Sequence, residues 1–82
     1  MVKRLDYNSK HENKYVVLGL NISYYRKKLN MTQEQLGYLC GLSRTYISNI
    51  ESPSKAYAIS MDSLFNIAEV LEVQPGDLLK EK

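Results

Sequence analysis

Residues 43–51, with the sequence SRTYISNIE, combine the spacing of a short helix with many hydrogen-bonding side chains. Ile47 and Ile50 are the only aliphatic residues in this stretch. A helix would place them on one side and leave a second side to the polar residues Arg44, Thr45, Ser48 and Asn49. Arginine can donate two hydrogen bonds to guanine, asparagine can pair with adenine, and threonine can touch a thymine methyl group. The stretch therefore offers donors and acceptors that could bond to another molecule, and the alternative is a solvated polar face without a ligand.

The chain has 82 residues, which is enough for one domain and too few for a second core. Its 44% hydrophobic and 24% charged residues are typical of a soluble globular protein. A domain of this size buries only about 60–65% of the surface of its unfolded chain, so we expect marginal stability. Contact with a partner or with a second copy would add burial.

Residue types that build metal or catalytic sites are scarce. Cys40 and His11 are the only cysteine and the only histidine, which excludes an internal disulfide and argues against a metal site. The sequence has no glycine-rich phosphate loop and no histidine-centred nucleophile, so we expect neither an enzyme nor a cofactor nor a small-molecule ligand. It also lacks a secretion signal and a membrane span, and a single cysteine suits a reducing compartment. We therefore expect a cytoplasmic protein.

Charged residues are distributed unevenly along the chain. Residues 1–30 hold seven basic and two acidic residues, whereas residues 61–82 hold five acidic and two basic ones. A basic side of the molecule could meet phosphate groups. Similar asymmetry occurs on ordinary solvated surfaces, so the charge pattern alone is weak evidence for nucleic-acid binding.

Apolar residues recur at helical spacing, and no strand-like alternation of useful length is present, which predicts an all-α fold. A first helix is predicted at residues 15–29, with an apolar face made of Leu18, Ile22, Tyr25 and Leu29. Asn30 tolerates the left-handed conformation that ends many helices. Thr32 and Gln35 form a capping box at the start of a second helix, which ends at Gly41 and carries the apolar residues Leu36, Leu39 and Cys40.

Two further serine caps indicate where the later helices begin. Ser43 caps the third helix and Ser60 caps a fourth, whose predicted apolar face is Met61, Leu64, Phe65, Ala68 and Leu71. Pro75 begins a short fifth helix, and residues 52–60 are predicted to be a loop. Residues 1–14 are predicted to be a basic, flexible arm before a domain at residues 15–82. The arm could follow a minor groove or simply increase solubility.

Residues 33–50 have the layout of a helix-turn-helix, in which the second of two helices enters the DNA major groove. Gly37 is small where the two helices must lie close together, and Gly41 permits a sharp turn between them. Apolar contacts that hold the angle between the helices are expected from Leu36, Leu42, Ile47 and Ile50.

The string MTQEQLGYLCGLSRTYISNIE, residues 31–51, resembles the helix-turn-helix regulators of the Cro and lambda-repressor type, called the XRE family. Within that family, RTYISNIE is similar to restriction–modification controller proteins. The resemblance extends from about Leu18 to Leu79. It implies a compact five-helix, lambda-repressor-like domain that binds double-stranded operator DNA, commonly as a symmetric dimer.

The resemblance also implies a role for individual residues. Base reading is implied for Arg44, Thr45, Ser48 and Asn49, and contact with the DNA backbone for Gln33, Ser43, Tyr46, Ser54 and Lys55. Gln33 could instead be a solvent-exposed helix residue, and Tyr46 could instead pack on the second helix. Arg26 and Glu51 match a salt bridge that joins the first helix to the end of the third, which is a structural role.

The loop after the third helix departs from the family pattern. Ser52 and Ile59 stand where many relatives have glycine and proline, with about two extra residues between them. The direction of the Tyr57 side chain is left open, since it could face the core or the DNA. Cys40 matches an interior position and should behave as a small hydrophobe.

The sequence thus favours a sequence-specific transcriptional regulator, most simply a repressor, whose third helix docks in the major groove of a palindromic operator as a homodimer. The dimer contacts are expected near the junction of the fourth and fifth helices, at Leu71, Val73, Leu78 and Leu79. The alternative is a protein-interaction module, such as an antitoxin or a bridging factor, that keeps the helix-turn-helix but holds a protein through its fourth or fifth helix.

Overall fold

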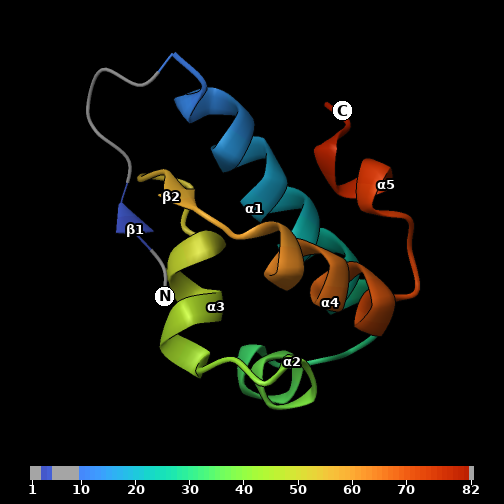
Figure 1. Ribbon diagram of the computed structural model, residues 1–82. Coiled ribbons are helices and arrows are strands. Elements are labelled where there is room, and N and C mark those ends of the chain that lie inside the picture. Colours follow the sequence, from blue (N-terminus) through green and yellow to red (C-terminus); the bar gives the residue numbers. More distant parts are fainter. Residues whose placement is uncertain (1–2, 5–9, 82) are drawn as a thin grey trace.

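The structure is a computed structural model that describes residues 3–4 and 10–81 (Figure 1). Within them lie five helices: α1 (Glu12–Lys28), α2 (Gln33–Cys40), α3 (Arg44–Ile50), α4 (Met61–Leu71) and α5 (Pro75–Leu79). The mostly helical fold confirms the prediction, as does the order of the helices. Residues 1–2 and 5–9 of the predicted arm lie outside the described residues. Helix α1 begins three residues earlier than predicted, at Glu12, where an acidic side chain suits the positive end of the helix dipole.

A short pair of strands was not predicted. Strand β1 (Lys3–Arg4) pairs with β2 (Tyr57–Ala58) in antiparallel register, with Lys3 opposite Ala58 and Arg4 opposite Tyr57. Periodicity could not show this pairing, because two residues are too few for an alternating pattern. The pairing gives the predicted loop at residues 52–60 a fixed path beside α3, and it leaves the Tyr57 side chain half-buried against the core.

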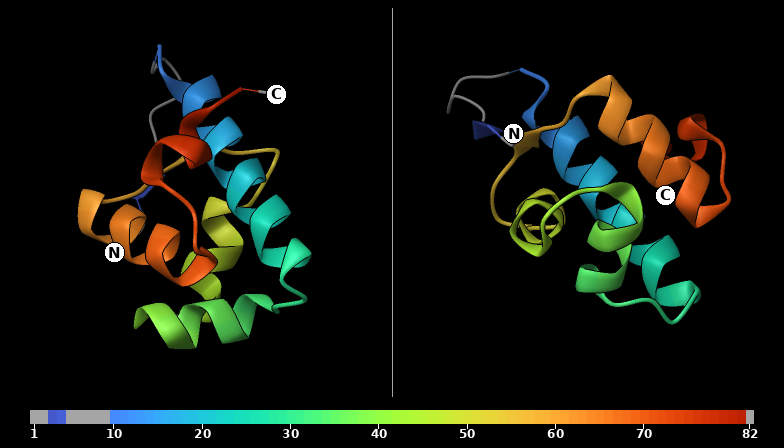
Figure 2. Two further views of the ribbon diagram at one scale, coloured as in Figure 1. Left: turned by 90° about the vertical axis from the view of Figure 1, so that its right-hand side faces the viewer. Right: turned by 60° about the horizontal axis from the view of Figure 1, so that its bottom comes forward.

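Every helix contributes one completely buried side chain to the core. These residues are Ile22, Leu36, Ile47, Ile67 and Leu78, each 0% exposed. Helices α2 and α3 pack against each other, α4 packs on α2, and α5 lies along α1 at the end of the molecule away from α2 (Figure 2). The core therefore links the predicted helix-turn-helix to the three other helices, and it fixes the buried side of α3.

The apolar faces of the helices are narrower than predicted. In α4 the buried apolar residues are Leu64, Ile67, Ala68 and Leu71. This set excludes Met61 and Phe65, which remain 60% and 48% exposed at the edge of that face. Two other residues predicted to be apolar contacts, Leu29 at the end of α1 and Leu39 in α2, are also exposed. The spacing of apolar residues alone does not fix the rotation of a helix.

The predicted dimer contacts need correction for the same reason. Leu71 and Leu78 are 3% and 0% exposed, because they join α4 and α5 to the core of their own chain. Neither side chain can meet a second copy without leaving that core. Of the four predicted residues, only Val73, which is half-buried, and Leu79, which is 55% exposed, reach the surface.

Candidate nucleic-acid interface

The ends of α2 and α3 are fixed by local hydrogen bonds that the sequence predicted. The Thr32 hydroxyl accepts a bond from the Gln35 backbone N–H at 3.0 Å, and the Gln35 side chain accepts one from the Thr32 N–H at 2.8 Å. Gly41 adopts the left-handed conformation with φ 72°, and the Ser43 hydroxyl accepts from the Tyr46 N–H at 3.0 Å. These contacts confirm the capping box, the glycine turn and the serine cap, and they set the entry of the chain into α3.

Gly37 lies against the turn between the two helices. A Cβ atom at this position would be 2.6 Å from the Leu42 carbonyl oxygen and 3.2 Å from that of Ser43. The predicted close approach is therefore present, and it is between α2 and the backbone of the turn. A larger residue would push α3 away from α2.

Helix α3 presents two different sides. Ile47 is 0% exposed and Ile50 is 5% exposed, so both are core residues. The predicted base-reading residues lie on the other side, where Arg44, Thr45 and Ser48 are exposed and Asn49 is half-buried. The structure thus brings these residues together on one outward surface, which we call the recognition face (Arg44, Thr45, Ser48 and Asn49). Its position fits side chains that contact bases.

Tyr46 belongs to the core and only 8% of its surface is exposed. The structure therefore favours the packing alternative for its aromatic ring, which is too buried to lie along a DNA groove. Its neighbours in the predicted backbone set differ, because Ser43, Ser54 and Lys55 are exposed. The Ser43 hydroxyl accepts the cap bond, and its own hydrogen remains able to donate outward.

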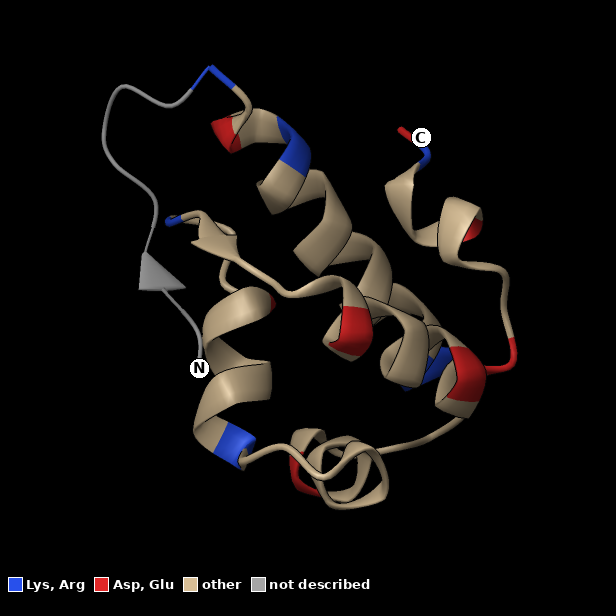
Figure 3. Ribbon diagram, viewed as in Figure 1, with Lys and Arg blue, Asp and Glu red and all other residues tan. Residues whose placement is uncertain are grey.

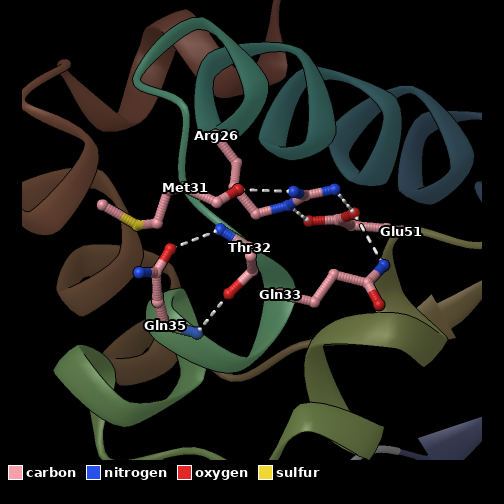
Figure 4. A network of polar contacts seen from close by, with 6 residues as sticks. All are labelled: Arg26, Met31, Thr32, Gln33, Gln35 and Glu51. Atoms are coloured by element: carbon pink, nitrogen blue, oxygen red, sulfur yellow. Dashed lines mark hydrogen bonds and ion pairs between the residues drawn. The ribbon is translucent and has the colours of Figure 1, made fainter.

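A buried ion pair supports the C-terminal end of α3 (Figure 4). Arg26 Nε and Nη2 donate to the two carboxylate oxygens of Glu51, each at 2.8 Å, and Arg26 Nη1 donates to the Met31 carbonyl oxygen at 2.7 Å. The side chains of Arg26 and Glu51 are only 8% and 4% exposed. The hydrogen bond to Glu51 raises the pKa of Arg26 above its ordinary value, so the guanidinium stays charged. The predicted salt bridge is confirmed.

Gln33 has a structural contact that the sequence did not reveal. Its side-chain Nε2 donates to Glu51 Oε1 at 3.0 Å, which connects the first residue of α2 to the ion pair. The side chain is half-buried, so it is neither a fully exposed helix residue nor free of protein contacts. A primary amide carries two N–H donors, and one of them remains for another acceptor.

The charges of the helices differ from one side of the molecule to the other. Figure 3 shows the blue of basic residues at the start of α3 and the red of acidic residues on α4 and α5. The acidic residues of that region are Asp62, Glu69, Glu72 and Asp77. DNA is polyanionic, so an approach with α3 in front is electrostatically favoured over an approach with α4 and α5 in front.

Cys40 lies at the last position of α2, half-buried against the core. Burial raises the pKa of its thiol, because the charged thiolate is disfavoured away from water. Among residues 3–4 and 10–81, no cluster of histidine, cysteine, aspartate or glutamate could hold a metal ion, and no helix is long and apolar enough to cross a bilayer.

The sequence reasoning missed Gly19, which positions α1 against α3. A Cβ atom at Gly19 would be 1.8 Å from the Ile50 carbonyl oxygen, so only glycine allows the two helices to approach so closely. The available signal was a glycine in the interior of a helical pattern, which often marks close backbone packing.

A family profile for the helix-turn-helix matches residues 22–78. The chain belongs to this family of XRE-type helix-turn-helix proteins. Its members are DNA-binding transcription regulators. The match begins within α1 and ends in α5, so it includes both helices of the motif and the helices that support them.

Individual relatives agree with this assignment. The chain is 48% identical over 52 residues to the control protein C.BamHI of Bacillus amyloliquefaciens, a match that covers 63% of this chain and 62% of that protein. The restriction-modification controller protein C.AhdI of Aeromonas hydrophila has a similar structure, with a TM-score of 0.72 and 26% identity over 80% of this chain and 97% of that one. SinR, solved in complex with DNA, gives a TM-score of 0.70 and 28% identity over 77% and 98% of the two chains. The resemblance to controller proteins is confirmed, and the protein is a DNA-binding helix-turn-helix regulator.

Proposed function

We propose that the protein is a sequence-specific repressor that binds a palindromic operator as a homodimer, with one α3 in each of two successive major grooves. The observation that carries the proposal is the recognition face. Its polar side chains are outward while Ile47, on the opposite side of α3, is completely buried. A rigid helix with this division can enter a groove without losing its contacts with the core.

The recognition face suggests a division of labour among its residues. Arg44, in the first turn of α3, has the reach and the two donors to contact guanine O6 and N7. The side chains of Thr45 and Ser48 are short, so they contact only the bases that lie closest to their own positions on α3. Asn49 is half-buried, which limits its reach. It can therefore pair with an adenine only at the edge of the contact with DNA. The exposed residues Ser43, Ser54 and Lys55 flank the helix and contact phosphate groups.

The related controller and repressor proteins support a role in transcription. A repressor acts by occupying its operator, so it needs no surface beyond the DNA-binding and dimer contacts. For the dimer, Leu79 on α5 supplies exposed apolar area, together with the edge residue Val73. Two recognition helices would then lie about 34 Å apart, one turn of DNA.

Selection from a pool of random duplexes tests this function directly. We expect enrichment of a sequence with two-fold symmetry, in which the half-sites are about one helical turn apart. Sedimentation of the protein with the selected duplex should give two chains per duplex. A pool that shows no enrichment after repeated rounds would contradict sequence-specific binding, and one chain per duplex would contradict the dimer.

A second candidate function is a module that holds another protein. The exposed side chains of Met61 and Phe65 on α4 favour it, because they are one helical turn apart and form an apolar surface. The selection bears on both functions, because a module that acts only by holding a protein would not enrich a DNA sequence.

A further inference from the structure

An apolar groove of about 270 Å³ lies where the N-terminal end of α1 meets the beginning of α4 and the end of α5. The stretch between β2 and α4 forms part of its wall. The apolar residues that line it are Leu18, Ile59, Met61, Leu64 and Leu79, and the other lining residues are His11, Lys14 and Tyr15. Its volume is close to the lower limit for sites that bind small molecules, about 300 Å³. The groove therefore matches a small ligand.

The groove combines buried and exposed apolar residues. Leu18 and Leu64 are each 4% exposed, so their side of the groove belongs to the core and is fixed. Met61 and Leu79 are 60% and 55% exposed, although both side chains are apolar. A ligand that covers these two side chains removes apolar surface from water, which is favourable. The flexible thioether chain of Met61 can also adapt to the shape of the ligand.

The polar side of the groove is basic. Lys14 is exposed and forms no ion pair with the part of the chain that the structure describes. No aspartate or glutamate among residues 3–4 and 10–81 lines the groove, and Glu12 lies outside its walls. The positive end of the α1 dipole is also at this side, because α1 begins here. The groove therefore favours an anionic group over a cationic one at this position.

We propose that this groove binds a small amphipathic carboxylate, whose apolar chain or ring covers Met61 and Leu79 and whose carboxylate bonds to Lys14. Apolar sites with a few polar groups that fix orientation are the common design for small ligands. Leu79 also supplies apolar area to the proposed dimer, so the bound carboxylate competes with the second copy and weakens operator binding. This competition rests on the proposed function, whereas the binding of the carboxylate does not. No small-molecule ligand was expected from the sequence, because only folding brings these distant segments together.

Three probes with the same apolar chain test the preference for an anion. Octanoate, octanol and octylamine differ in the charge of the head group, and titration of the full chain without DNA, followed by backbone amide chemical shifts, measures each affinity. We expect octanoate to shift the amides of Lys14, Ile59, Met61 and Leu79 and to bind most tightly, with octylamine weakest. Equal binding of octanoate and octylamine would overturn the proposal. Shifts that follow the protein concentration and not octanoate would assign the groove to a second copy and would also overturn it.

Two variants with matched controls test the charged and the apolar contacts separately. Lys14→Gln should weaken octanoate binding by about two- to fivefold, as for one exposed ion pair, and leave octanol binding unchanged. Lys28→Gln removes the same charge from the other end of α1, outside the groove, and should leave both affinities nearly unchanged. Leu79→Ala should weaken the binding of both probes, whereas Leu39→Ala, at a similarly exposed leucine of α2, should not. Equal effects of the two lysine variants, or of the two leucine variants, would overturn the site.

The selected duplex tests the competition with the second copy. Octanoate should raise the protein concentration at which half of the duplex is bound, and the increase should be smaller for Lys14→Gln. If octanoate binds the protein and leaves the duplex titration unchanged, the competition for Leu79 is overturned while the proposed function stands. Absence of specific binding by the wild type without octanoate would remove the proposed function together with the competition, and the titration without DNA would still decide the carboxylate site.

Discussion

Arg26 and Glu51 are 25 positions apart in the sequence, and two hydrogen bonds of 2.8 Å join their side chains in the interior. The pair connects the C-terminal end of α1 to the residue that ends α3. Because Gln33 also donates to Glu51, a single carboxylate fixes the relation between α1, α2 and the recognition helix. The ion pair therefore serves DNA binding indirectly, by holding α3 in position.

Glu51→Gln should destabilise the fold strongly. The Arg26 guanidinium would stay charged and buried without its counter-charge, and breaking a buried pair in this way costs about 3–5 kcal/mol. In a domain with marginal stability, much of the chain would be unfolded at 25 °C. Urea unfolding followed by circular dichroism measures the loss. The control is Lys80→Gln, which breaks the exposed pair with Asp77 and should have little effect, because the Lys80 side chain is 75% exposed.

Gly19→Ala should destabilise the protein by forcing α1 and α3 apart. The new Cβ would meet the Ile50 carbonyl oxygen at 1.8 Å, and overpacking of this kind costs about 1–3 kcal/mol or more. Gly76→Ala is the matched control, since a Cβ there meets no atom within 4 Å and its φ is not positive. The control should be neutral or stabilising, by up to about 1 kcal/mol. Similar thermal midpoints for the two variants would show that α1 and α3 can separate without cost.

The features that the sequence predicted well depend on local chemistry. Thr32, Ser43 and Ser60 cap their helices by bonding to residues three positions later, and Gly41 ends α2 through its own backbone conformation. Each of these contacts is contained in a few adjacent residues. Their residue types and spacing are therefore sufficient to identify them. The same signals also locate the limits of α2, α3 and α4.

The features that were missed depend on residues far apart in the chain. The importance of Gly19 is apparent only when Ile50 lies beside it, and β2 exists only because Lys3 and Arg4 reach it. The Leu78 side chain was assigned to a dimer contact because an apolar residue has the same appearance in a core and in an interface. For the candidate site, the sequence identified the outward residues of α3 and missed the bond from Gln33 to Glu51.

Arg44→Ala should weaken specific DNA binding by about 1–3 kcal/mol and relax the preference at one base pair of each half-site. The cause is the loss of a side chain with two donors from the first turn of α3. Lys55→Ala is the control, since it removes one positive charge from an exposed position after the same helix. It should weaken binding to all sequences about equally and reduce the salt slope by about 1. Selection from random duplexes with each variant gives the base preference, and titration of the selected duplex at several salt concentrations gives the affinity and the salt slope. An unchanged base preference in Arg44→Ala would exclude it from base reading.

Tyr46→Ala and Tyr46→Phe should have different effects. The ring is part of the core, so its removal should cost about 3–5 kcal/mol, as for other large buried aromatic residues. Tyr46→Phe keeps the ring and removes only the hydroxyl, and should therefore leave the urea midpoint almost unchanged. The same variant tests the predicted contact with the DNA backbone. Weaker binding to every duplex, with normal stability, would assign the hydroxyl to a phosphate, and unchanged binding would limit Tyr46 to the core.

Cys40 should react slowly with thiol reagents in the folded protein. Burial raises the pKa of its thiol, so the folded state retains the proton to a higher pH than the unfolded state does. As the pH is increased, the rise in the alkylation rate should therefore occur at a higher pH in buffer than in 8 M urea. The same shift makes stability depend on pH. Its contribution is fully present below the pKa of the unfolded thiol and is lost as the pH rises through the higher folded value. Cys40→Ala should remove this part of the decline, so the difference between the pH dependences of wild-type and variant stability isolates the thiol. Equal alkylation profiles in buffer and in urea would place Cys40 in a solvated position.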